Sequence, residues 1–123
     1  MLTIKKIEDI REAEAYLKAH GISHNIANEQ AMGVYTQSGL IGLGSLCLCG
    51  YKVYLNFIHL AEEDAALSHG LAKSLLNMAD LRGIKTVYGS NPALDKLYAC
   101  LRFQKENEEY ALSLENYFQA EHN

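Results

Sequence analysis

The hydrophobic and polar positions of residues 64–82 repeat with the period of a helix. The apolar residues that share one face are Leu67, Leu71, Ala72, Leu75, Leu76, Met78 and Ala79. Spacings of three and four residues are typical of a helix that packs one face against a core. An apolar run over residues 53–60 precedes this helix across an acidic link. The pattern therefore predicts a strand followed by an amphipathic helix at the centre of the chain.

The rest of the chain alternates short apolar runs with turn signals. The predicted strands are residues 2–7, 31–37, 40–49, 53–60, 84–89, 103–107 and 109–118. The predicted helices begin at Glu8 or Asp9, at Asp64 and at Pro92, and they end at Gly21, at Gly83 and near Leu101. The strand–helix–strand step around the central helix should be parallel and right-handed. We therefore expect one α/β (α+β) domain over residues 1–123, with a mixed sheet of about six to seven strands.

Composition and charge exclude several classes of protein. The chain has 123 residues, of which 49% are hydrophobic and 21% charged, so one domain can bury a core without disulfides or metal. A formal charge of -4 leaves no basic stripe for phosphates, so we expect no nucleic-acid partner. No apolar run approaches the ~20 residues that span a membrane, and charged residues arrive early in place of a signal peptide. These features predict a cytoplasmic protein without a membrane partner.

The three cysteines, Cys47, Cys49 and Cys100, lack the spacing of metal ligands. We expect them to be small core residues, and we expect no metal site.

The start of the central helix is a candidate anion site. Residues 68–72, SHGLA, contain no proline and a single glycine, Gly70. A glycine near a first helical turn can bring backbone N–H groups close to an anion such as a pyrophosphate. The alternative is a packing glycine at a crowded strand-to-helix turn.

Two segments together resemble the GNAT family, the acetyl-CoA-dependent N-acetyltransferases. The central motif of that family is Arg or Gln, two residues, Gly, one residue, then Gly or Ala, at a helix start after a splayed strand. Residues 67–72, LSHGLA, match it at Gly70 and Ala72, whereas Leu67 replaces the Arg or Gln.

The second segment matches a later motif of the family, which is Asn, six residues, Tyr, and Gly-Phe four residues on. Asn91, Tyr98 and Phe103 occupy these positions, and Arg102 replaces the glycine. The resemblance covers about residues 30–118 and agrees with the predicted order of elements. It implies splayed central strands with helices on both faces of the sheet.

The resemblance also implies a binding site for acetyl-CoA. The implied cofactor-binding residues are Leu60, Ala61, Glu62, Leu67, Ser68, His69, Gly70, Leu71, Ala72, Lys73 and Asn91. The backbone at the end of the strand would hold the pantetheine amides and polarise the thioester, while backbone N–H groups of residues 68–73 would hold the pyrophosphate. Lys73 can compensate in part for the missing arginine. For Asn91, a helix N-cap ahead of Pro92 is the alternative role.

The candidate catalytic residues are Tyr98 and Glu62. Tyr98 matches a position where the family often has a general acid, and we expect its hydroxyl to reach a solvated cleft from the helix edge. The alternative is a core-edge tyrosine with a satisfied hydroxyl. Glu62, Glu63 and His59 are candidate bases, although a solvated acidic loop also explains the two glutamates.

The sequence thus predicts an N-acetyltransferase that transfers an acetyl group to an unidentified amine by direct attack on the thioester. Its acceptor would be a small-molecule or peptide amine, and the acidic balance favours a cationic one. The alternative, favoured by Leu67 and Arg102, is a non-catalytic acyl-CoA-binding or interaction domain with the same fold. The segment that usually covers the acceptor is compressed into residues 8–30, so that side is open or completed by a second subunit of a homodimer.

Overall fold

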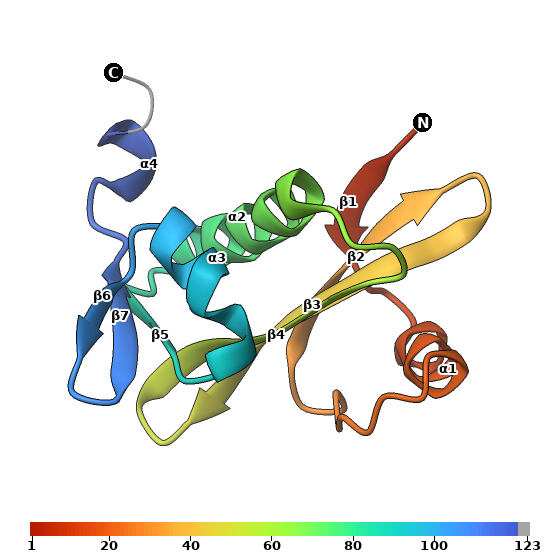
Figure 1. Ribbon diagram of the computed structural model, residues 1–123, viewed down its shortest axis with the longest axis horizontal. Helices are drawn as coiled ribbons and strands as arrows, with labels where there is room; N and C mark the ends of the chain where they lie inside the picture. The colour runs from red at the N-terminus through yellow and green to blue at the C-terminus, as the bar shows by residue number, and fades with distance from the viewer. Residues whose placement is uncertain (121–123) are drawn as a thin grey trace.

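The computed structural model describes residues 1–120, which form a seven-stranded sheet in the order β1-β2-β3-β4-β5-β7-β6 (Figure 1). The strands are β1 (Thr3–Lys6), β2 (Gln30–Thr36), β3 (Gly39–Cys49), β4 (Lys52–Leu60), β5 (Thr86–Gly89), β6 (Gln104–Glu106) and β7 (Glu109–Ser113). The helices are α1 (Ile10–Ala19), α2 (Ala65–Leu81), the 3-10 turn η1 (Pro92–Leu94), α3 (Asp95–Cys100) and α4 (Tyr117–Ala120). Only the β4–β5 pair is parallel. The predicted α/β fold with a mixed sheet is confirmed.

The two longer helices begin and end at residues that the sequence marks. Asp9 and Asp64 precede α1 and α2, and each carboxylate accepts a hydrogen bond from a backbone N–H group of the first turn. Gly21 and Gly83 follow the helices with φ angles of 66° and 82°, a conformation that glycine adopts without steric cost.

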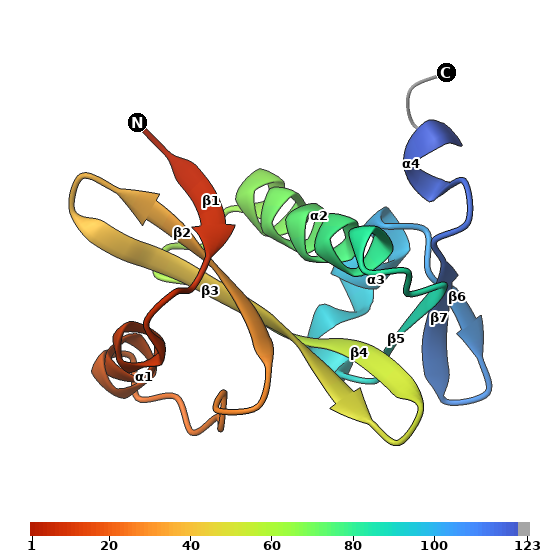
Figure 2. The same cartoon turned by 180° about the vertical axis from the view of Figure 1, so that it is seen from behind.

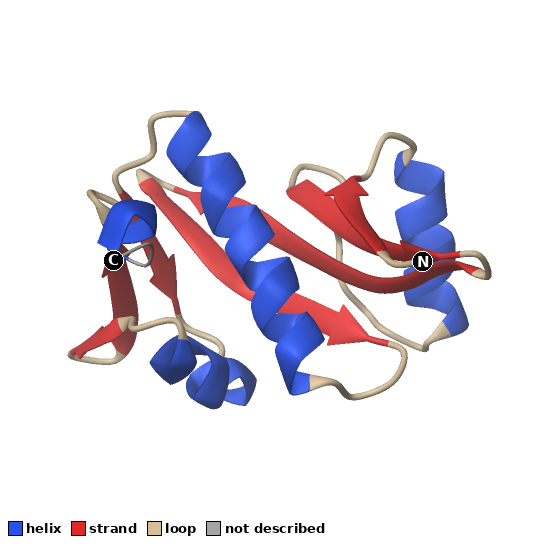
Figure 3. Cartoon of the chain, turned by 90° about the horizontal axis from the view of Figure 1, so that it is seen from above, coloured by secondary structure: helices blue, strands red, loops and turns tan. Residues whose placement is uncertain are grey.

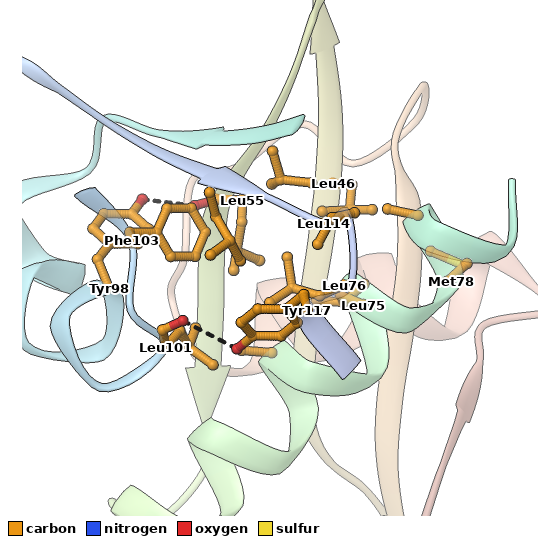
Figure 4. Packing of buried hydrophobic residues seen from close by; sticks show 14 of the residues in the cluster. Leu46, Leu55, Leu75, Leu76, Met78, Tyr98, Leu101, Phe103, Leu114 and Tyr117 are labelled. Atoms are coloured by element: carbon orange, nitrogen blue, oxygen red, sulfur yellow. Dashed lines mark hydrogen bonds between the residues drawn. The ribbon is translucent and has the colours of Figure 1, made fainter. Parts of the chain in front are cut away.

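Helices cover both faces of the sheet, as predicted. Figures 1 and 2 show α1 on one face and α2 with α3 on the other. The larger core cluster lies under α2 and α3 (Figure 4), and the smaller one lies under α1. A Cβ atom at Gly44 would lie 3.0 Å from Leu75 Cδ1, so the glycine lets α2 cross close to β3. Viewed from above, α2 bridges the β1–β2 side and the β5–β7 side of the molecule (Figure 3).

The central strands separate soon after they meet. β4 pairs with β5 only where Val53 and Tyr54 lie beside residues 87 and 88. The register of β3 and β4 then shifts, because Ser45 pairs with Phe57 whereas the next residue of β3 pairs with residue 55. Asn56 is therefore the extra residue of a β-bulge, which bends β4. Beyond it, residues 57–60 are paired on the β3 side only, and the predicted splay is confirmed.

The structure differs from the sequence prediction at the C-terminal end. The expected strand over residues 109–118 stops at Ser113, because Asn116 takes a left-handed conformation (φ 60°) and turns the chain into α4. Two of the three cysteines, Cys49 and Cys100, are exposed, so their assignment to the core was wrong. Within residues 1–120, no helix combines the length and the apolar character needed to cross a bilayer.

Candidate functional site

The open edge of β4 is the first feature of the site. The Ala61 N–H donates to the Ile41 carbonyl at 2.8 Å, on the β3 side. Because ladder groups alternate along an antiparallel strand, the backbone N–H and C=O groups of Leu60 and Ile58 point the other way, where β5 has already diverged. This edge can hold an extended chain of amides by backbone hydrogen bonds, and it includes the predicted contact residue Leu60. The Ala61 N–H, by contrast, is already engaged.

A hydrogen-bonded network closes the N-terminal end of this open edge. The Tyr98 hydroxyl donates to the Leu55 carbonyl at 2.6 Å and lies 3.0 Å from Asn56 Oδ1. The Ser90 N–H donates to the same Asn56 oxygen at 2.8 Å, and Asn91 Nδ2 donates to the Asn56 carbonyl at 2.8 Å. Side chains therefore join β4 to the segment after β5 at the point where the backbone ladder ends.

The two predicted site residues in this network are both engaged within the chain. Tyr98 is fully buried, its ring packs over Gly89, and burial raises the pKa of its hydroxyl to about 12. The expectation of a hydroxyl at a solvated helix edge was wrong, and a satisfied buried tyrosine describes the residue better. The Asn91 side chain caps η1 by accepting from the Ala93 N–H at 3.0 Å, so the N-cap role is confirmed. Their catalytic and cofactor-binding roles stay predictions.

The N-terminus of α2 lies beyond the C-terminal end of β4. Asp64 Oδ1 accepts from the Leu67 N–H at 3.0 Å, and the Asp64 carbonyl accepts from the Ser68 N–H at 2.9 Å. Gly70 is the sixth residue of α2, and a Cβ atom there would meet Ile4 of β1 at 3.7 Å. The expectation of Gly70 near the first turn was wrong, because Asp64 starts the helix at Ala65. The N–H groups of residues 69–73 therefore belong to the ladder of α2 itself.

A cavity of about 360 Å³ lies against this helix start. Its lining residues are Leu2, Ile41, Ala61, Glu62, Glu63, Asp64 and Leu67. Three of them are acidic and exposed, and none is Lys or Arg. The Lys73 ammonium lies farther along α2, over the rings of Tyr117 and Phe118 at 5.5 and 5.8 Å. Burial, followed by the charge of Arg102, lowers the pKa of Lys73.

A tyrosine–histidine pair lies on the α1 face of β4. The Tyr16 hydroxyl is 2.8 Å from His59 Nδ1 and 3.3 Å from the Ile41 carbonyl. The His20 ring lies 5.2 Å from the His59 ring. Burial, and secondly the charge of His20, lowers the pKa of His59 from its ordinary 6.5. The half-buried His59 imidazole is therefore mostly neutral at pH 7 and able to accept a proton.

Comparison with known proteins gives a fold. No protein-family model and no curated protein matches the sequence. Among solved structures, an N-acetyltransferase from Staphylococcus aureus Mu50 superposes with a TM-score of 0.78 at 14% identity, over 94% of this chain and 99% of that one. The ribosomal-protein-S18-alanine N-acetyltransferase from Escherichia coli gives 0.69 at 16% identity, over 93% and 94%. YhhK from Escherichia coli, solved bound to coenzyme A, gives 0.64 at 12% identity, over 92% and 98%.

This chain has the GNAT fold.

Coenzyme A, the ligand solved with YhhK, can be compared with the two parts of this site. The outward backbone N–H and C=O groups of Ile58 and Leu60 can pair with the two amides of a pantetheine arm. A nucleotide diphosphate is disfavoured at the start of α2, because the Asp64 carboxylate holds the Leu67 N–H group and Glu62 and Glu63 add negative charge. The predicted diphosphate contacts at residues 68–73 are therefore not supported by the geometry.

Two residues of the site were missed in the sequence. Asn56 organises the network at the splay, and its signal was a lone amide in the apolar run 53–60. Tyr16 orients His59, although the sequence showed it only as a neighbour of the apolar face of α1. Neither contact joins residues close in sequence, so helical or strand periodicity does not reveal them.

Proposed function

We propose that this chain transfers an acyl group from a pantetheine thioester, such as acetyl-CoA, to an amine. The observation that carries the proposal is the unpaired stretch of β4 with His59 on it, in a GNAT fold. A thioester bound along this edge supplies an activated acyl group beside a neutral imidazole.

The backbone of β4 is proposed to bind and orient the donor. The N–H groups of Ile58 and Leu60 point to the open edge, where an N–H donor can stabilise negative charge on a carbonyl oxygen. The ladder to β3 fixes these groups in advance of binding, so they need little rearrangement.

His59 is the proposed base. When the Tyr16 hydroxyl donates to the Ile41 carbonyl, His59 Nδ1–H can donate to the Tyr16 oxygen. That arrangement leaves the Nε2 lone pair free to take a proton from an ammonium acceptor or its amine. Glu62 is the weaker candidate, because it is exposed in the link beyond β4 and borders the acidic cavity. Tyr98 acts as general acid only if its hydroxyl leaves the Leu55 carbonyl.

The acceptor is proposed to be a small-molecule or peptide amine that approaches from the α1 face. His20, Tyr16 and His59 form an aromatic cluster there, with ring centroids 4.2 to 5.6 Å apart. An amine beside His59 is also beside the open edge of β4. Completion of this side by a second copy of the chain remains a prediction.

The test combines binding with turnover. Acetyl-CoA at saturating concentration should raise the melting temperature, since a ligand that binds only the folded state stabilises it. A panel of amines should then release free thiol from acetyl-CoA, and the His59→Gln variant should lose at least tenfold in rate with unchanged binding. Release of thiol at the wild-type rate by His59→Gln would remove His59 from the mechanism.

A non-catalytic acyl-CoA-binding or interaction domain is the second candidate. It is favoured by the buried Tyr98 hydroxyl, which is held by Leu55 and Asn56 rather than presented to a ligand. Binding of acetyl-CoA without release of thiol toward any amine in the panel would support this candidate over the transferase.

A further inference from the structure

We infer that this chain recognises its acyl donor through the pantetheine arm alone, so that a simple pantetheine thioester binds as well as acetyl-CoA. The inference rests on the proposed function and adds the chemical class of the donor. It follows from three features of the link between β4 and α2.

The first feature is the direction of the open edge. An arm paired with Ile58 and Leu60 leads, at the C-terminal end of β4, to the link 61–64 and the first turn of α2. A helix N-terminus in this position normally attracts an anion through its free N–H groups and its dipole. Here the Asp64 carboxylate holds the Leu67 N–H, and this fixed negative charge sits where an anion would bind.

The second feature is the surrounding charge. Glu62 and Glu63 border the same cavity, and both are exposed. Two carboxylates beside a diphosphate weaken its binding by several-fold at physiological salt, because charges closer than the Debye length of about 8 Å are only partly screened. No basic residue lines the cavity to offset them. Lys73 is nine residues beyond Asp64, about 13 Å along the helix, and faces Tyr117 and Phe118.

The third feature is the apolar part of the cavity. Leu2, Ile41 and Leu67 line it beside the carboxylates. The outer end of pantetheine carries two geminal methyl groups and hydroxyl groups without charge, which suit an apolar surface with hydrogen-bond acceptors at its rim. Leu67 thus places a hydrophobic side chain at the position where the GNAT motif has Arg or Gln, whose N–H groups can donate to a phosphate.

The inference is tested by titrating the ¹⁵N-labelled protein with acetyl-CoA, S-acetylpantetheine and adenosine 3′,5′-bisphosphate, and following backbone amide shifts. The dissociation constants of the two thioesters should agree within about threefold, and the bisphosphate should leave the amides of β4 and α2 unmoved. Acetyl-CoA binding at least thirtyfold tighter than S-acetylpantetheine would overturn the inference and leave the proposed function standing. If neither thioester shifts the amides of β4, the proposed function and the inference both fail.

A charge variant gives a second readout. Glu62→Gln/Glu63→Gln should tighten acetyl-CoA about fivefold more than S-acetylpantetheine at low salt, because only the former carries the diphosphate. The matched control is Glu106→Gln/Glu108→Gln on the exposed β6–β7 hairpin, which changes net charge equally and should affect neither ligand. Equal tightening by both variants would overturn the local role of Glu62 and Glu63. Asp64 stays in place in these variants because it caps α2.

Discussion

Replacement of Tyr98 by phenylalanine separates a structural hydroxyl from a catalytic one. The hydroxyl is buried and donates to the Leu55 carbonyl at 2.6 Å, at the place where β4 leaves β5. Tyr98→Phe keeps the ring packing against Phe103 and Tyr110 but leaves that carbonyl, and part of the Asn56 amide, without a partner. An unsatisfied buried polar group costs about 1–3 kcal/mol, so we expect a loss of about 1–2 kcal/mol in the free energy of unfolding.

The expected loss is large enough to measure in a protein of this size. It corresponds to a fall of about 4–8 °C in melting temperature. Thermal and urea unfolding, followed by circular dichroism, should both show it. Tyr110→Phe is the matched control, because Tyr110 belongs to the same aromatic cluster and its hydroxyl forms no hydrogen bond within the described residues. Its melting temperature should change by less than about 2 °C.

A measurement of turnover distinguishes a catalytic role of the Tyr98 hydroxyl from a structural one. A general acid contributes typically ~10²–10⁴-fold to the rate, so loss of such an acid from a solvated edge lowers turnover without lowering stability. An unchanged melting temperature with turnover at least tenfold lower would refute the structural reasoning and return Tyr98 to the catalytic role expected from sequence.

Three further variants or conditions test other parts of the structure. Gly70→Ala should stabilise the protein by about 0.5–1 kcal/mol in urea unfolding, because the new Cβ meets only Ile4 at 3.7 Å and Gly is a poor helix former; a loss of stability would mean that the helix start is misplaced. Leu67→Arg should tighten acetyl-CoA by up to about a hundredfold in calorimetry, and looser binding would place Leu67 in the core. Because the pKa of His59 is lowered by folding, the unfolded state binds more protons near and below pH 6.5. The stabilising contribution of the neutral His59 is therefore complete above pH 6.5, and it is lost as the pH falls through the pKa of His59 in the folded state. Urea unfolding from pH 7.5 to 4.5 should show a smaller loss in His59→Gln, and identical curves would contradict the shift.

The order of elements could be predicted from the sequence because its signals are local. The face of α2 follows a three-to-four spacing, and Gly21 and Gly83 stop helices by backbone conformation alone. The predicted start of α2 at Asp64 is one residue early, because Asp64 is the N-cap and the helix begins at Ala65. An aspartate before a helical run is compatible with either role until its backbone conformation is known.

The surroundings of the site could not be predicted in the same way. The burial of Tyr98 depends on Gly89, which lets the ring approach β5, and on Asn56, which lies 42 residues away in the sequence. Helical position gives the direction of a side chain but says nothing of what packs over it. The pairing of Tyr16 with His59 likewise arises only when α1 docks on the sheet.

The short contact between β4 and β5 divides the sheet into two halves, one with β1 to β4 and one with β5 to β7. Two residue pairs, at Val53 and Tyr54, join the halves by backbone pairing, and α2 lies across both halves. Beyond the two backbone pairs, Asn56 joins the diverging strands through hydrogen bonds to Ser90 and Asn91. A substitution of Asn56 is therefore expected to loosen the opening between β4 and β5 while the two backbone pairs at Val53 and Tyr54 stay in place.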